Sequence, residues 1–266
     1  MNYLPILSHG SVVPERETGW KDSLPASLKR RDPRIWQLAY VASKRALDSA
    51  GKASKSIVCG TALGALDETR GYLDGVFKDG FGSPRHFIAS VHNSMAGKLA
   101  LEFKIDGPNL TVCEGQNTLA SSIVTASLLS PEECPVLVVI VDENIALMQQ
   151  VLPYLSNDCR AYLAEGWDEA AVALVLDAPA PRKEPCIAAV GPSAAGNGNP
   201  MEACAALAAG AGMDPRTLSP LDETSDSFLK PALCVDAWLR NRHTGEFGAG
   251  SYSPSARAAA LVSLCL

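Results

Sequence analysis

GPNLTVCEGQNTLASS, residues 107–122, has the pattern of a short strand that turns sharply into a helix. Gly107 and Pro108 are typical of a turn, residues 110–113 predict a buried strand, and a break at 114–115 precedes a helix that begins near Gln116. A side chain at such a break lies at a helix N-terminus, where unpaired N–H groups favour negative charge. A cysteine there would have a lowered pKa and would attack thioesters as a thiolate. The neutral carboxamide of Gln116 cannot do so.

The residues before this turn resemble a known family. Residues 83–116 resemble, without a gap, the segment of β-ketoacyl-acyl-carrier-protein synthases that leads into the catalytic cysteine. The shared points are Ser83-Pro84, Asn93, Ala96-Gly97, Leu99 and Gly107-Pro108, and counting from Gly107 puts the family's cysteine at Gln116. Residues 59–64 (CGTALG) resemble the family's glycine-rich loop, and residues 165–177 (EGWDEAAVALVLD) resemble its acidic-then-hydrophobic strand element. The resemblance covers residues 30–178.

The resemblance implies a truncated thiolase-like, ketosynthase-type layered α/β/α fold. We expect a ketosynthase-like N-terminal thiolase half at residues 1–178 and a shortened C-terminal region at residues 179–266 that completes the sheet. A complete ketosynthase would be about 150 residues longer, judged against usual domain sizes. The family's second half carries two histidines, in HGTGT-like and GHxxGAxG-like contexts, and neither context occurs here. The four histidines are His9, His86, His92 and His243. We interpret His243 as a cation at a helix C-terminus.

A ketosynthase-like chain with glutamine at the cysteine position resembles a chain length factor. That resemblance implies a non-catalytic subunit that forms a heterodimer with a cysteine-bearing ketosynthase, works with acyl carrier protein, and shapes the acyl tunnel during polyketide or polyene chain elongation. The shortness of the chain resembles the subunits of aryl polyene pathways. The face around residues 87–95 and 110–113 would lie against the partner. No catalytic residue is expected, and the expected tunnel and interface residues are Tyr72, Leu73, Phe77, Phe87, Met95, Cys113 and Gln116.

Three alternatives to a chain length factor stay open. Gln116 could hold a thioester carbonyl or enolate by hydrogen bonds, as in a glutamine-type malonyl-acyl-carrier-protein decarboxylase, although the two missing histidine contexts weaken this interpretation. The chain could be a self-associating structural thiolase-fold protein. A Cys113–His92 pair could serve a cysteine hydrolase, but the predicted position of Cys113 inside an apolar strand would leave its thiol inert.

Composition excludes several other classes of protein. With 266 residues, 47% of them hydrophobic, the chain can bury a substantial core in one or two domains. A net charge of −6 argues against a nucleic-acid surface. The basic residues at 29–34 form a solvated turn or a small patch for an acidic carrier protein. Eight cysteines without a CxxC pair indicate buried free thiols of a reducing cytoplasm. No signal peptide, membrane span, metal or cofactor is expected.

Hydrophobic periodicity predicts alternating helices and strands. Asp32 and Pro33 should form the N-cap and first turn of a helix over residues 35–50. Residues 136–141 (VLVVIV) predict a strand covered on both faces, followed by Asp142 and Glu143, which either serve a site or only solvate the strand end. The other predicted helices span residues 67–77, 92–103, 117–129, 201–211 and 226–241, the other strands span 57–60, 187–190 and 258–264, and a turn-rich segment spans 248–255.

Overall fold

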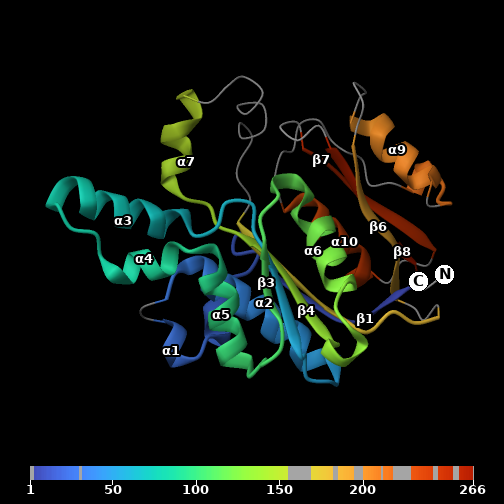
Figure 1. The fold of residues 1–266 in the computed structure, drawn as a ribbon, viewed down its shortest axis with the longest axis horizontal. Helices are drawn as coiled ribbons and strands as arrows, with labels where there is room; N and C mark the ends of the chain where they lie inside the picture. Colours follow the sequence, from blue (N-terminus) through green and yellow to red (C-terminus); the bar gives the residue numbers. More distant parts are fainter. Residues whose placement is uncertain are drawn as a thin grey trace.

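The computed structural model describes residues 3–29, 32–154, 169–181, 185–194, 200–210, 212–217, 229–241, 245–253 and 258–265. These residues form one mixed sheet with helices on both faces (Figure 1). The strands are β1 (Leu4–Val12), β2 (Ser56–Gly60), β3 (Asn109–Val112), β4 (Val136–Asp142), β5 (Ala170–Leu176), β6 (Cys186–Ala194), β7 (Glu246–Ser253) and β8 (Ala258–Cys265). The α-helices are α1 (Ala26–Lys29), α2 (Arg34–Ala50), α3 (Leu66–Asp79), α4 (Pro84–Ser90), α5 (His92–Phe103), α6 (Thr118–Ser127), α7 (Ala146–Val151), α9 (Pro200–Gly210) and α10 (Lys230–Asn241).

The strands follow the order β3-β2-β4-β5-β1-β6-β8-β7. β3, β2 and β4 are parallel to one another, whereas the other neighbouring pairs are antiparallel. β1 runs beside β5 and, at Leu4 and Pro5, also pairs with β6. Strands from before and after residue 178 therefore share one sheet. The division of the chain into domains at that residue stays a prediction.

Two apolar cores lie on opposite faces of the sheet. Every residue of β4 is buried, and side chains alternate between the faces because successive residues of a strand point in opposite directions. Val138 and Ile140 pack in the core that includes α6 and α10, while Leu137 and Val139 pack in the core that includes α2 and α5. The predicted strand with two covered faces is confirmed, and so is the layered α/β/α arrangement.

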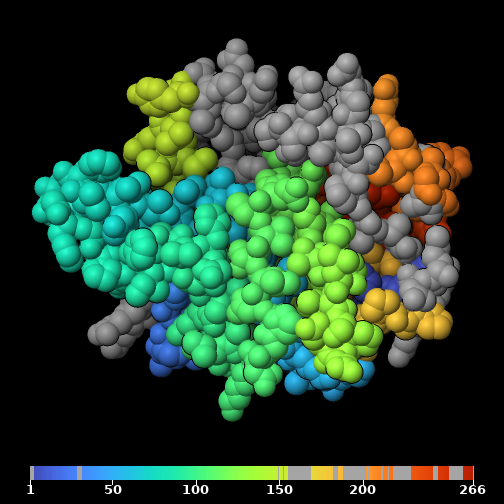
Figure 2. Space-filling view, viewed as in Figure 1, coloured from blue at the N-terminus to red at the C-terminus, as the bar shows by residue number. Residues whose placement is uncertain are grey.

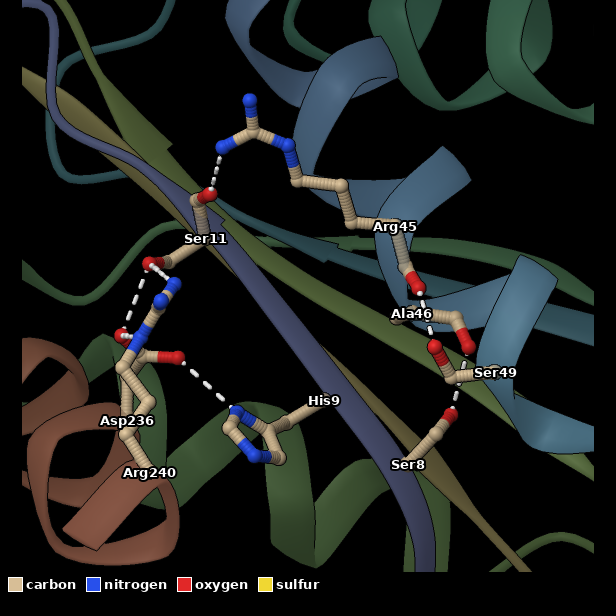
Figure 3. Close-up of polar contacts among 8 residues, drawn as sticks. All are labelled: Ser8, His9, Ser11, Arg45, Ala46, Ser49, Asp236 and Arg240. Atoms are coloured by element: carbon tan, nitrogen blue, oxygen red, sulfur yellow. Dashed lines mark hydrogen bonds and ion pairs between the residues drawn. The ribbon is translucent and has the colours of Figure 1, made fainter. Parts of the chain in front are cut away.

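A buried polar network ties the first strand to the last helix (Figure 3). The carboxylate of Asp236 on α10 accepts a hydrogen bond from Ser11 Oγ at 2.7 Å and lies 3.0 Å from His9 Nδ1, both on β1. Arg240 Nε donates to the same carboxylate at 2.7 Å and its Nη2 donates to Ser11 Oγ. Burial raises the pKa of Asp236, but the hydrogen bonds from His9, Arg240 and Ser11 outweigh this effect and lower that pKa below its usual value. The charged carboxylate thus holds α10 against β1.

Several sequence predictions need correction. The first long helix begins at Arg34, with Pro33 at its N-cap, so the predicted Asp32–Pro33 cap is displaced by one residue. The segment predicted to be turn-rich is mostly β7, which pairs along its whole length with β8. The strand was not predicted because its glycines and serines do not produce an alternation of hydrophobic and polar residues. The predicted helix over 117–129 ends at Ser127, and Leu128 beyond it is 80% exposed. The pattern analysis did not predict β1 or α4.

Helices α3 and α4 form an arm that projects from the body of the molecule, to the left in Figure 1. Tyr72 on α3 contacts Phe87 on α4, with ring centroids 5.4 Å apart. Gly82 between the two helices approaches the Tyr72 ring so closely that a Cβ there would overlap it. None of the described helices is long and apolar enough to cross a membrane.

The predicted burial of the cysteines holds for most of those that the structure describes. Five are buried, Cys234 is half-buried, and Cys113 is exposed, so the prediction is wrong for Cys113. Cys159 and His243 lie outside the described residues.

Gly60, at the end of β2, tests how tightly α6 packs on the sheet. A Cβ at this position would lie 2.5 Å from Ile140 Cδ1 and 2.6 Å from Ser122 Oγ. We therefore expect Gly60→Ala to lower the free energy of unfolding by about 1–3 kcal/mol. In the control, Gly97→Ala, the added methyl meets no atom within 4 Å and should raise that free energy by about 0.5–1 kcal/mol. Urea unfolding measures both, and equal effects would contradict the packing described.

Candidate functional site

The strand-turn-helix predicted from residues 107–122 is present. β3 ends at Val112, a short 3₁₀ helix spans Gly115–Asn117, and α6 follows directly. Gly115 has φ of 53°, a left-handed conformation that glycine adopts without strain. Gln116 is half-buried in this turn, at the N-terminal end of α6. The side chain at residue 116 therefore occupies the position where a helix N-terminus would stabilise negative charge.

Hydrogen bonds fix the turn. Thr118 Oγ1 donates to the carbonyl of Gly115 at 2.7 Å and accepts the N–H of Glu114 at 3.1 Å. Ser251 Oγ on β7 donates to Asn117 Oδ1 at 2.8 Å, which links the turn to the far end of the chain. The turn is thus held by bonds among its own residues and by Ser251 near the C-terminal end of the chain.

A buried carboxylate shapes the loop beside this turn. Asp142, at the end of β4, accepts hydrogen bonds from Thr61 Oγ1 and from the backbone N–H groups of Ala62 and Leu63, at 2.8 to 3.1 Å. Burial raises the pKa of Asp142 to about 6, although these hydrogen bonds lower it in part. Asp142 is 2% exposed and Glu143 is 6% exposed, so the idea that they only solvate the strand end is wrong, and the oxygens of Asp142 hold the loop that follows β2.

Cys113 lies in the turn and not inside the strand, which corrects the sequence prediction. Its Sγ donates to the carbonyl of Ala62 at 3.1 Å. Burial raises the pKa of the Cys113 thiol, and the charge of Asp142 raises it further. The thiol is therefore protonated at neutral pH and is a weak nucleophile, although its residue is exposed. Its hydrogen-bond partner is a carbonyl and not a His92 nitrogen, so the structure gives no support to a Cys113–His92 pair.

The described histidines act elsewhere: His9 bonds to α10, His86 Nδ1 lies 2.6 Å from Glu68 Oε2, and the His92 ring packs against Gly64. No group of three or more His, Cys, Asp or Glu side chains in the described ranges could hold a metal ion. The turn at Gln116 thus has a neutral amide where a nucleophile would stand, with no described histidine hydrogen-bonded to it.

The predicted tunnel and interface residues divide into three groups. Phe77 is 82% exposed, Phe87 is 53% exposed, and together with Tyr72 and Leu73 they lie on the α3–α4 arm. Met95 is buried between α5 and the sheet. Cys113 and Gln116 share the turn. The aromatic residues of the predicted set therefore lie on the arm, whereas other elements form the turn.

Sequence reasoning missed the ion pairs made by residues of α2 and α5. Arg34 Nε donates to Glu169 Oε1 at 2.6 Å, and Lys98 contacts Asp32 and Glu102. The ion pair at Arg34 weakens the idea of a free basic patch at residues 29–34, and Arg30 and Arg31 of that patch lie outside the described residues. No sequence pattern could have indicated the Arg34–Glu169 pair, because it spans 135 positions.

Residues 8–180 match the family model described as the N-terminal domain of β-ketoacyl synthases. The chain belongs to the β-ketoacyl synthase family. No curated protein matches its sequence.

Solved structures with the same thiolase-like fold include members of this family. The ishigamide ketosynthase/chain length factor matches with a TM-score of 0.78 and 16% identity, over 99% of each chain. The complex of the ketosynthase ApeO with its chain length factor ApeC from Xenorhabdus doucetiae matches with a TM-score of 0.66 and 17% identity, over 98% of this chain and 99% of the other. The complex AntDE:AntF, a type II polyketide acyl-carrier protein with its ketosynthase, matches with a TM-score of 0.72 and 12% identity, over 99% of each chain.

The reactivity of Cys113 tests the conclusion that this β-ketoacyl synthase family member has no thiolate at the turn. At pH 7.5 we expect iodoacetamide to alkylate Cys113 about fivefold or more slowly than free cysteine, because its pKa is raised. Peptide mass spectrometry over a time course gives the rate, with Cys113→Ser as the control for peptide assignment. A rate at or above that of free cysteine would reveal an activated thiol and reopen the hydrolase alternative.

Proposed function

We propose that this chain is a chain-length-factor-like, non-catalytic subunit that pairs with a cysteine-bearing ketosynthase and shapes its acyl tunnel. The observation that carries the proposal is the turn itself. It keeps the strand, the left-handed glycine and the helix N-terminus that would activate a cysteine, yet it presents Gln116 there. A carboxamide cannot form a thioester, so this subunit would depend on a partner for chain elongation.

Exposed apolar residues support a partner on one face. Nine of the eleven large hydrophobic residues that are exposed in the described chain lie between residues 73 and 110. They include Phe81 and Ile88 of the arm region, Leu101 on α5 and Leu110 on β3. Figure 2 shows α5, β3 and α6 side by side on the face toward the viewer, with the arm beside them. A patch of this kind marks an interaction site in a stable protein.

The edge strand β3 also supports a partner on this face of the molecule. β3 hydrogen-bonds to β2 on one side only, at the end of the sheet order. Thr111 Oγ1 on β3 is buried without a hydrogen-bond partner in the described chain. An uncovered edge with free backbone groups is a template for pairing with another chain. We therefore assign the ketosynthase to the surface formed by the arm, α5 and β3, named the partner face below.

The remaining parts of the proposal are supported by family membership and by the chain length factors among the similar structures. The ketosynthase partner would carry the cysteine, acyl carrier protein would deliver the growing chain, and both would meet this subunit in the cytoplasm. Tyr72, Leu73, Phe77 and Phe87 would lie where the arm meets the partner's acyl chain. The pathway would elongate a polyketide or polyene chain of the aryl polyene type.

Charge substitutions on the partner face test the proposed pairing. We expect Leu110→Asp and Ile88→Asp to weaken the complex with the co-expressed ketosynthase about 100-fold or more, because each would bury an unpaired charge. Co-purification and size-exclusion chromatography with mass determination measure the complex.

The matched control is Ala206→Asp, on the exposed side of α9 near the opposite edge of the sheet. It should leave the one-to-one complex intact. If wild type forms no complex with the ketosynthase, the subunit proposal fails. If wild type forms only a homodimer, the self-associating structural alternative replaces it.

Gln116→Ala separates a scaffold from a decarboxylase. In the purified complex, we expect acyl-chain elongation to stay within about twofold of wild type, because the amide takes no part in bond making. Malonyl decarboxylation and chain elongation are followed separately by mass spectrometry of the carrier-protein thioesters. A selective loss of decarboxylation would assign Gln116 a catalytic role and favour the decarboxylase alternative.

A further inference from the structure

Two buried cysteines face each other across neighbouring strands of the sheet. Cys186 begins β6 and Cys265 ends β8, and the two residues are direct partners in the antiparallel register of these strands. Their Sγ atoms lie 2.9 Å apart, and both side chains are thiols in the structure. The partner face, formed by the arm, α5 and β3, includes neither residue.

Strand geometry places both sulfurs on the same face of the sheet. Their neighbours Ile187 and Leu264 belong to the core that includes α6 and α10. Because successive side chains of a strand point to opposite faces, Cys186 and Cys265 both point to the other face. Directly opposed residues of antiparallel strands have Cα atoms about 4.5–5.5 Å apart, and a disulfide spans Cα separations of about 4.4–6.8 Å. The two cysteines can therefore be joined without a shift of the strands.

The close second sulfur distinguishes this pair from other described cysteines. Cys113, Cys134 and Cys204 donate to backbone carbonyl groups. Cys265 Sγ also lies 3.7 Å from the carbonyl oxygen of Cys186, but the Cys186 sulfur is nearer. A buried cysteine on its own acts as a small apolar side chain. A second thiol within reach gives it a reaction partner, because disulfides form between neighbouring sulfurs.

The position of the pair at one end of the strands gives an oxidant a route to it. β6 begins at Cys186, β8 ends at Cys265, and beside them β7 begins at the exposed Glu246. The register of β6 against β8 shifts between Ile187 and Ala189, so an irregularity separates this end from the rest of the two strands. Such an irregularity disrupts the ladder of hydrogen bonds. Frayed ends open at a lower free-energy cost than strand centres, so a local opening would expose both thiols.

We propose that Cys186 and Cys265 form a reversible disulfide when the protein meets a hydroperoxide. One sulfur attacks the peroxide as a thiolate, the O–O bond breaks, and water or an alcohol leaves with the proton of the thiol. The second sulfur then attacks the sulfenic acid, the S–O bond breaks, and water leaves. Two thiols are oxidised, one hydroperoxide is reduced, and the chain loses two hydrogen atoms. A dithiol reductant reverses the reaction by thiol–disulfide exchange.

The disulfide would stabilise strands that support the Gln116 turn. It joins residues 79 positions apart and holds β6 to β8. A link across such a long segment restricts the unfolded chain and so favours the folded one. β8 also pairs with β7, whose Ser251 donates to Asn117 in the turn. Oxidation would therefore make the C-terminal support of the turn harder to unfold.

Oxidation of the purified full chain with hydrogen peroxide, without denaturant, tests the site. Remaining thiols are blocked with iodoacetamide, and mass spectrometry of a digest made without reductant identifies linked peptides. We expect a Cys186–Cys265 link in most wild-type chains, its removal by dithiothreitol, and its absence in Cys186→Ser and Cys265→Ser. The matched control is Cys204→Ser, which replaces another buried thiol by a hydroxyl that can still donate to the Ser251 carbonyl. It should form the link to the wild-type extent.

Thermal unfolding of the wild-type chain gives a second readout that needs no variant. The midpoint of the oxidised chain should lie about 5 °C or more above that of the reduced chain, and dithiothreitol should remove the difference. The proposal is overturned if the native chain forms no Cys186–Cys265 link, forms it only in urea, or joins these cysteines mainly to others. An unchanged midpoint in the linked chain would overturn the stabilising role. No ketosynthase is needed, so the outcome is independent of the proposed pairing.

Discussion

The structure depends on the burial of β4 and β5 on both faces. Neither strand exposes any residue, and helices from both layers pack on them. A strand in this position must be apolar along its whole length, because an unpaired polar side chain would be costly on either side. Polar and chemically useful groups are therefore confined to the strand ends. Asp142 is the last residue of β4, Glu143 follows it, and the Gln116 turn begins where β3 ends.

This constraint explains which features the sequence could predict. A run such as VLVVIV and a break such as Glu114-Gly115 are local patterns, and both produced the expected strand and turn. The Asp236 network joins residues 225 or more positions apart, and no local pattern records such a contact. The position of Cys113 shows how precisely a strand end would have to be predicted from sequence. A shift of one residue at the end of β3 moved it from a strand interior to an exposed turn, which changes its surroundings and its pKa.

The same distinction applies to the candidate site. Sequence comparison within a family predicts which residue stands at the turn, because the turn is a contiguous segment. It could not predict the hydrogen bond from Ser251, since the two residues that it joins are distant in sequence. The partners of Arg34 belong to this class as well. The sequence was thus enough to predict which residues stand at the turn. The charges and hydrogen bonds around them could be found only from the folded structure.

The two edges of the sheet argue for a subunit that is completed by another chain. At one edge, α9 and α10 both pack against β7. At the other edge β3 is only four residues long and packs beside α5, whose Leu101 is exposed. Natural sheets protect such an edge by charge, by a covering element or by a partner. Leu110 supplies no charge, and no described element pairs with the outer side of β3. A second protein would cover this edge, and the neutral side chain of Gln116 at the turn supports the proposal that this protein is a cysteine-bearing ketosynthase.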